Sequence, residues 1–181
     1  MESQEQTEPP PNSNPWTAAD VESILHEHGW LVGDASAEQL TWCDRAATLL
    51  GPQTEDRKTL EGLLRLVFHY DAATLITQVE SHIALSRYAA RDVLREAGRI
   101  LLESDDLDSD RFKQLIALLR EKLELSARDI LMPIRLALAG QLGEGDLDRV
   151  ILLLDPAAAL PWAVPVKSAR ARMVEFFAVL D

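Results

Sequence analysis

The sequence predicts an all-α fold, arranged as a two-part helical bundle. Apolar residues recur three and four positions apart through most of the 181 residues, the spacing that lines one face of a helix. The chain has no sustained alternation of apolar and polar residues, which a half-buried strand needs. Side chains that cap helix N-termini precede several apolar segments, so these segments have defined starts.

Residues 1–15 are predicted to be a disordered tail, because they hold four of the nine prolines and few apolar residues. Residues 16–103 form the predicted N-terminal helical subdomain. Thr17 with Asp20, and Ser36 with Gln39, have the spacing of capping boxes. The expected helices cover residues 17–28, 36–50, 54–68, a short segment after Asp71, and one uninterrupted stretch over 81–102.

Residues 104–181 form the predicted C-terminal helical subdomain, which follows an acidic loop. Its first helix, over 111–123, has a clean amphipathic pattern. Ser126 with Asp129 caps the next helix, which is expected to end at Gly140. A turn at residues 143–145 leads to a helix over 146–154, three prolines interrupt the following stretch, and a last helix covers 168–180.

Composition bounds the function. The net charge of −12 and the isoelectric point of about 4.7 argue against nucleic acid as a default partner, although a local basic stripe stays compatible with them. The sequence has no signal-peptide pattern and no apolar run that approaches the roughly 20 residues of a membrane span. The lone cysteine, Cys43, fits a reducing compartment. We therefore expect a cytoplasmic protein without a membrane partner.

No catalytic motif is found in the sequence. A Gly-rich phosphate loop, a G-x-S-x-G elbow and a Cys-x-x-Cys pair are all absent. His26 and His28 are two residues apart and point in different directions on a helix, so they do not form a metal-ligand pair. Cys43 is expected to be a small buried hydrophobic residue. We predict a protein that is not an enzyme and has no cofactor, metal site or catalytic residue.

Four arginines follow one another at four-residue steps. Arg87, Arg91, Arg95 and Arg99 each lie about 40° further round the expected helix than the last, and so form a slowly winding basic ridge. This ridge could be a track for an anion, an RNA backbone or an acidic protein. The alternative is an ordinary solvated flank, in which Asp92 and Glu96 pair with the arginines three residues later.

A second feature is the apolar run over 131–140, which contains an internal proline and one arginine, Arg135. This run resembles the last part of the anticodon-binding domain of bacterial glutamyl-tRNA synthetases, whose pattern is Pro-Leu/Ile-Arg-x-Ala-Leu-Thr-Gly, then a short turn and a Leu-rich helix. The residues that match directly are Pro133, Ile134, Arg135, Ala137, Leu138 and Gly140. The whole resemblance covers residues 108–155. It implies that Arg135, Glu144, Gly145 and Leu147 lie beside the anticodon bases.

The sequence departs from this family at three positions. Ala139 stands in place of the threonine, Gly145 where proline is common, and Glu144 brings a negative charge to the place of a base. The His-Ile-Gly-His-like and Lys-Met-Ser-Lys-like signatures of the synthetase catalytic domain do not occur in it. The resemblance therefore implies a free-standing, non-catalytic module that binds tRNA or a synthetase-like protein. The alternative is a helical protein–protein interaction module that kept the fold and lost RNA binding. No pattern in the sequence indicates the oligomeric state.

Overall fold

The computed structural model of the chain describes residues 14–180, and the predicted all-α fold is confirmed. Residues 1–13, most of the predicted tail, lie outside the described part. Within residues 14–180 there is no strand, and one short 3₁₀ helix, η1 (Gly51–Gln53), follows the second α-helix. The α-helices are α1 (Ala18–Glu27), α2 (Ala37–Leu50), α3 (Arg57–Phe68), α4 (Ala72–Leu75), α5 (Val79–Ser86), α6 (Ala90–Glu103), α7 (Ser109–Leu123), α8 (Ala127–Ala139), α9 (Gly145–Ala158) and α10 (Ala169–Leu180).

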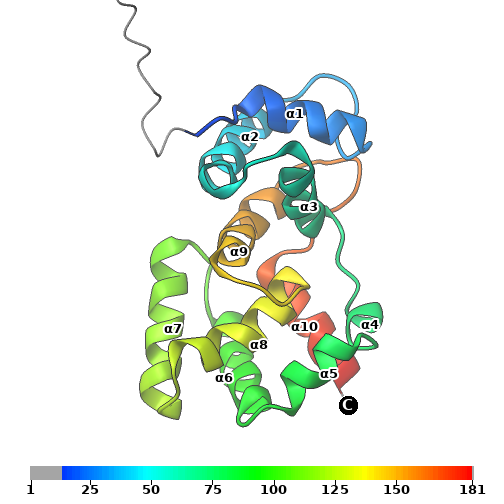
Figure 1. Cartoon of the computed structure of the whole chain (residues 1–181). Helices are drawn as coiled ribbons and strands as arrows, with labels where there is room; N and C mark the ends of the chain where they lie inside the picture. The colour runs from blue at the N-terminus through cyan, green and yellow to red at the C-terminus, as the bar shows by residue number, and fades with distance from the viewer. Residues whose placement is uncertain (1–13, 181) are drawn as a thin grey trace, which may run out of the picture.

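Helix α9 lies at the centre of the arrangement (Figure 1). It packs against α2 and α3 on one side, while α8 contacts it on the other. Helix α8 in turn packs against α5, α6, α7 and α10 (Figure 1). Of the two remaining α-helices in the described residues, α1 packs against α2 and α4 packs against α10. The turn that joins α8 to α9 therefore links the two groups of helices. The boundary predicted between residues 103 and 104 stays a prediction.

Local hydrogen bonds explain most helix starts. Thr17 and Ser36 form the capping boxes predicted for α1 and α2, and Ser126 caps α8 through the amide of Asp129. The start of α3 differs from the prediction, because its capping residue is Asp56, which accepts from the Thr59 amide at 2.7 Å. Thr54 instead donates its hydroxyl to the Leu50 carbonyl and belongs to the preceding turn.

The prediction of one helix over residues 81–102 is wrong, because the chain breaks between α5 and α6. Ser81 and Ala84 are buried on α5, and Ala90 and Val93 are buried on α6. Ala90 follows Ser81 by nine residues, and Val93 follows Ala84 by the same number, which is about two and a half helical turns. One straight helix would therefore place the buried face of α5 and the buried face of α6 on opposite sides. The break turns both faces to the core. Ile83, expected on the apolar face of one long helix, is 58% exposed as a result.

The helix predicted over 146–154 is also longer than expected, since α9 continues through Pro156 to Ala158. Pro156 has no amide hydrogen, so α9 lacks the one backbone bond that this position would donate to the Leu152 carbonyl. The indole of Trp162 then donates to the Ala157 carbonyl at 2.9 Å, which satisfies the end of the helix. Packing of the buried Ala157 therefore keeps this last turn helical.

One continuous cluster of buried side chains joins all parts of the bundle. Four of its aromatic side chains stack on one another or meet edge to face: Trp30, Trp42, Phe68 and Trp162. The prediction for Cys43 is confirmed: its side chain is fully buried, and this burial, with a smaller contribution from Glu22, raises the pKa of its thiol to about 12. A thiol with such a pKa is not a nucleophile at neutral pH.

Candidate functional site

The turn between α8 and α9 brings the sequence motif into a defined geometry. Gly140 ends α8 in the left-handed region, at φ 78°, and its amide donates to the Leu136 carbonyl. The chain then reverses and enters α9 at Gly145. Because the turn is short, the last turns of α8 face the first turn of α9. Arg135 and Asp148 meet across this gap.

Arg135 forms a two-pronged ion pair with Asp148. Its Nε donates to Oδ1 at 2.6 Å and its Nη2 donates to Oδ2 at 2.8 Å, while Nη1 donates to the Gly143 carbonyl at 3.1 Å. The side chain is 11% exposed. These bonds to Asp148, with the nearby charges of Glu144 and Asp146, raise the pKa of Arg135 against the opposing effect of burial. The guanidinium therefore stays charged and holds the turn closed.

The other predicted site residues have different environments. Glu144 and Gly145 are exposed at the start of α9, in the same turn as Arg135. Leu147 is only 1% exposed and belongs to the core. The structure thus brings Arg135, Glu144 and Gly145 together, and places Leu147 beneath them as packing. Their contact with anticodon bases stays a prediction.

The four ridge arginines do not share one helix. Arg87 lies in the α5–α6 break and pairs with Asp129 at the start of α8, at 3.3 Å. Arg91, Arg95 and Arg99 follow the exposed side of α6. The pairs predicted for Arg95 with Asp92 and for Arg99 with Glu96 are confirmed. Arg91 donates to the Leu180 carbonyl at 3.4 Å. The ridge is exposed, but carboxylates offset much of its charge.

The sequence reasoning missed a buried arginine beneath the site. Arg172 on α10 is fully buried, and its guanidinium lies 4.8 Å from the centre of the Tyr70 ring. Burial lowers its pKa to about 10. It donates to the carbonyls of Leu66 and Val67 at the end of α3 and of Leu138 at the end of α8. It also donates to the Lys167 carbonyl in the segment before α10. Carbonyls at helix C-termini carry partial negative charge, so they can compensate a buried cation.

Arg172 therefore fixes the end of α8, directly before the turn to which Arg135 is bonded. The sequence does carry a signal for it. Arg172 occupies an apolar phase on its helix with Ala169, Met173 and Phe176, which are also buried. An arginine in that phase must find partners inside the protein.

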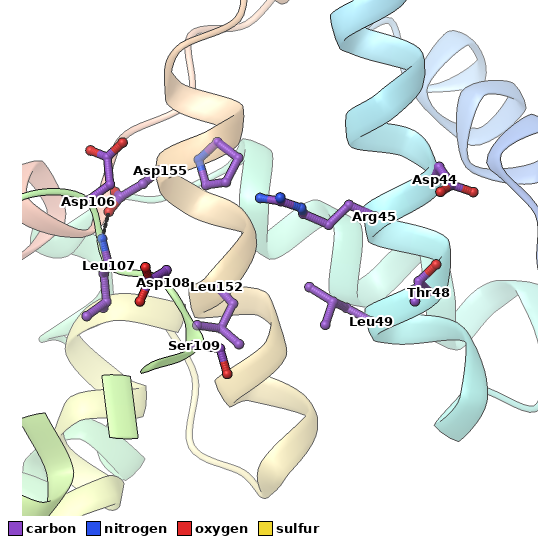
Figure 2. A pocket seen from close by; sticks show the side chains of 11 residues that line it. Asp44, Arg45, Thr48, Leu49, Asp106, Leu107, Asp108, Ser109, Leu152 and Asp155 are labelled. Atoms are coloured by element: carbon purple, nitrogen blue, oxygen red, sulfur yellow. Dashed lines mark hydrogen bonds between the residues drawn. The ribbon is translucent and has the colours of Figure 1, made fainter. Parts of the chain in front are cut away.

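An open cleft of about 640 Å³ lies between α2, α9 and the segment that leads into α7 (Figure 2). Arg45 reaches into the cleft from α2 (Figure 2). Four carboxylates also line the cleft: Asp44, Asp106, Asp108 and Asp155. Asp155 accepts from the amides of Leu107 and Ala169, so it joins the α6–α7 loop to the start of α10. The carboxylates outnumber the arginine, and the cleft consequently repels a phosphate chain.

In residues 14–180, no group of three or more His, Cys, Asp and Glu side chains is placed to hold a metal ion. No helix in the same part of the chain is long and apolar enough to cross a membrane.

Comparison with known proteins identifies the family. No curated protein and no solved structure matches the chain. The sequence does match the anticodon binding domain family over residues 13–160. This range contains α1 to α9 together with the turn at Arg135, and it stops before α10. The match spans well over half of the chain, and the chain therefore belongs to the anticodon binding domain family.

Proposed function

We propose that this protein is a non-catalytic tRNA-binding module, related to the anticodon-binding domain of bacterial glutamyl-tRNA synthetases. The observation that carries the proposal is membership of the anticodon binding domain family over residues 13–160. The kinship with the glutamyl enzymes rests on the motif around Arg135. The α8–α9 turn is exposed at Glu144 and Gly145, which leaves it accessible to a ligand.

In this proposal the residues of the turn have separate roles. Arg135 is bonded to Asp148 and Gly143, so it supports the turn rather than contacting phosphates. Glu144 is the exposed group that reads a base, since a carboxylate accepts hydrogen bonds from exocyclic amino groups such as that of cytosine. Gly145 allows the base to approach the backbone, and Leu147 supports the first turn of α9 from the core.

A second candidate function is a helical protein–protein interaction module that kept the fold and lost RNA binding. The observation that favours it is electrostatic. Asp148 neutralises Arg135, three of the ridge arginines pair with carboxylates, and the net charge is −12. In either case we place the protein in the cytoplasm and keep residues 16–103 and 104–181 as its two proposed subdomains.

A filter-binding titration of the full chain with total tRNA distinguishes the two functions. Measured at about 50 mM and about 200 mM salt, binding should be detectable at the lower concentration and weaker at the higher one, because phosphate contacts release counterions. Arg95→Gln and Arg99→Gln should weaken binding similarly for all tRNAs and make the salt dependence shallower. Glu144→Gln should instead change the preference among tRNAs.

The protein–protein function predicts the opposite outcome. A wild-type chain without affinity for tRNA at low salt, where phosphate contacts are strongest, would refute the tRNA-binding proposal. An unchanged preference in Glu144→Gln, with binding retained, would refute only the role of Glu144.

A further inference from the structure

The α5–α6 break displays a tyrosine that packs against almost nothing. Tyr88 is 89% exposed, although a tyrosine ring has enough apolar area to be usually half-buried or more. It belongs to the segment between α5 and α6, and this segment lies at the lower end of the molecule in Figure 1. The hydrophobic core therefore does not explain this side chain.

The backbone that carries Tyr88 is unusual as well. Ala89 has φ 60° and ψ 5°, in the left-handed region that residues with a Cβ rarely adopt. The break itself follows from the opposite faces of α5 and α6, but a glycine would make the same turn without this strain. Strained residues of this kind concentrate at functional sites.

Two arginines lie close to Tyr88 in the sequence, and one of them lines a small cavity. Arg87 directly precedes Tyr88 and Arg91 follows it by three residues, and both are exposed. Arg91 also lines a cavity of about 310 Å³ between α5, α6 and the end of α10, together with Ile76, His82, Leu85, Ser86, Val179 and Leu180. The cavity combines apolar walls with two nitrogen-bearing side chains, His82 and Arg91.

We propose that the α5–α6 turn is a second RNA-binding site, which takes unpaired nucleotides apart from the α8–α9 turn. One base stacks on the exposed ring of Tyr88, and the cavity that Arg91 lines receives a neighbouring base. Arg91 holds the phosphate on one side, and Arg87 leaves its weak, exposed pair with Asp129 to hold the phosphate on the other. Aromatic rings flanked by cations are the usual platform for single-stranded RNA, because every base has a face that stacks. This inference rests on the proposed tRNA-binding function and extends it to a second contact.

Two aspartates near the α5–α6 turn offset part of its positive charge. Asp129 pairs with Arg87, and Asp92 pairs with Arg95. Arg91 lines the cavity and donates to the neutral Leu180 carbonyl, and no carboxylate within residues 14–180 pairs with it. Val79 and Ile83 are exposed on α5, at 69% and 58%, and a protein partner would be expected to cover them too. The arginines on both sides of Tyr88 favour RNA over that partner.

The test uses the full chain and a fluorescein-labelled, unstructured RNA of about 12 nucleotides, followed by fluorescence anisotropy. Tyr88→Ala should weaken binding by about 5- to 150-fold, the loss of one stacked base. Tyr88→Phe keeps the ring and should bind like the wild type. Arg91→Gln should make the salt dependence shallower, while the paired substitution Val79→Ser with Ile83→Ser should leave RNA affinity unchanged.

A second readout locates the contact. RNA that carries 4-thiouridine should form a photo-crosslink to the peptide containing Tyr88, and the Tyr88→Ala chain should lose it while its thermal midpoint stays that of the wild type.

An oligonucleotide affinity that is the same for Tyr88→Ala and wild type would overturn the inference, and total tRNA binding in the same experiment would leave the proposed function standing. Binding of the oligonucleotide without binding of tRNA would refute the proposed function alone. An RNA affinity that falls only in the Val79 and Ile83 variant would move the contact from the tyrosine to the face of α5 and overturn the site as proposed.

Discussion

Arg135 joins α8 to the first turn of α9, because its guanidinium donates to both carboxylate oxygens of Asp148 and to the Gly143 carbonyl. The motif identified it from its place between Pro133 and Gly140, and a lone arginine in an apolar run had to reach a partner. The partner, Asp148, could not be chosen from the sequence, because Glu144, Asp146 and Asp148 all lie within a few residues of the turn. Only the reversal of the chain after Gly140 selects among them.

We expect Arg135→Ala to lower the free energy of unfolding by about 1–3 kcal/mol, because Asp148 then loses its charged partner in a half-buried site. Urea denaturation at neutral pH measures this change. Arg95→Ala is the matched control: Arg95 also pairs with an aspartate, but it is 71% exposed, and its loss should stay within about 0.5 kcal/mol. Equal stabilities of the two variants would show that the Arg135 pair contributes little.

The same Arg135 variant also bears on function. If the tRNA proposal holds, a loosened turn lowers discrimination between tRNA species, since Glu144 loses its fixed position. If the interaction-module proposal holds, stability alone changes. Asp148→Ala combined with Arg135→Ala should recover part of the stability lost by either change, because no charge is then left unpaired.

At the scale of elements, several helix starts were predictable, although the start of α3 at Asp56 was not, and helix continuity was missed. Thr17, Ser36 and Ser126 each act through an amide three residues ahead, so their role is visible in local sequence. The α5–α6 break depends on which side of each helix the remaining bundle covers. Ile83 matched the apolar phase of α6 and suggested a continuous helix, whereas the buried phase of α5 runs through Ser81, a residue that composition alone marks as polar.

Helix α6 also approaches α10 closely, and two glycines test this contact. A Cβ added at Gly98 would fall on the ring of Phe177, whereas one added at Gly62 in α3 would meet nothing within 4 Å. We expect Gly98→Ala to destabilise the protein by about 1–3 kcal/mol through overpacking. Gly62→Ala should stabilise it by about 0.5–1 kcal/mol, the ordinary helix preference for alanine.

Thermal unfolding followed by circular dichroism compares the two glycine variants under one condition. If Gly98→Ala were stabilised as much as Gly62→Ala, α10 would not press against α6 in solution. Phe177→Ala introduced together with Gly98→Ala should remove the overpacking and separate this cause from a backbone effect.

For the whole molecule, the fold class followed from periodicity, but the way the chain closes on itself did not. Apolar spacing predicts one buried face for each helix, but it does not predict which faces pack against each other. The pairing of α9 with α2 and α3 joins segments that are far apart in the sequence. The role of α10 was equally hidden, because its anchor, Arg172, is a charged residue whose partners are backbone carbonyls contributed by distant helices.

The part of the chain beyond the family match contributes to the hydrophobic core. Residues 161–180 supply Trp162 to the aromatic cluster, and α10 buries Met173 and Phe176 against the bundle and binds the ends of α3 and α8 through Arg172. Each large apolar side chain contributes about 1.5–3 kcal/mol when fully buried. Their sum is comparable to the whole stability of a typical domain, about 5–15 kcal/mol.

A chain that ends after Leu160 should therefore keep much of its helical circular dichroism, lose its sharp thermal transition and bind a hydrophobic dye, as loosely packed helical states do. Arg170→Ala in the full chain is the control, because Arg170 is exposed on the same helix and its loss should leave the transition unchanged. A truncated chain that still unfolds sharply, near the wild-type temperature, would mean that α1 to α9 form a complete core. Helix α10 would then be a layer on that core rather than a part of it.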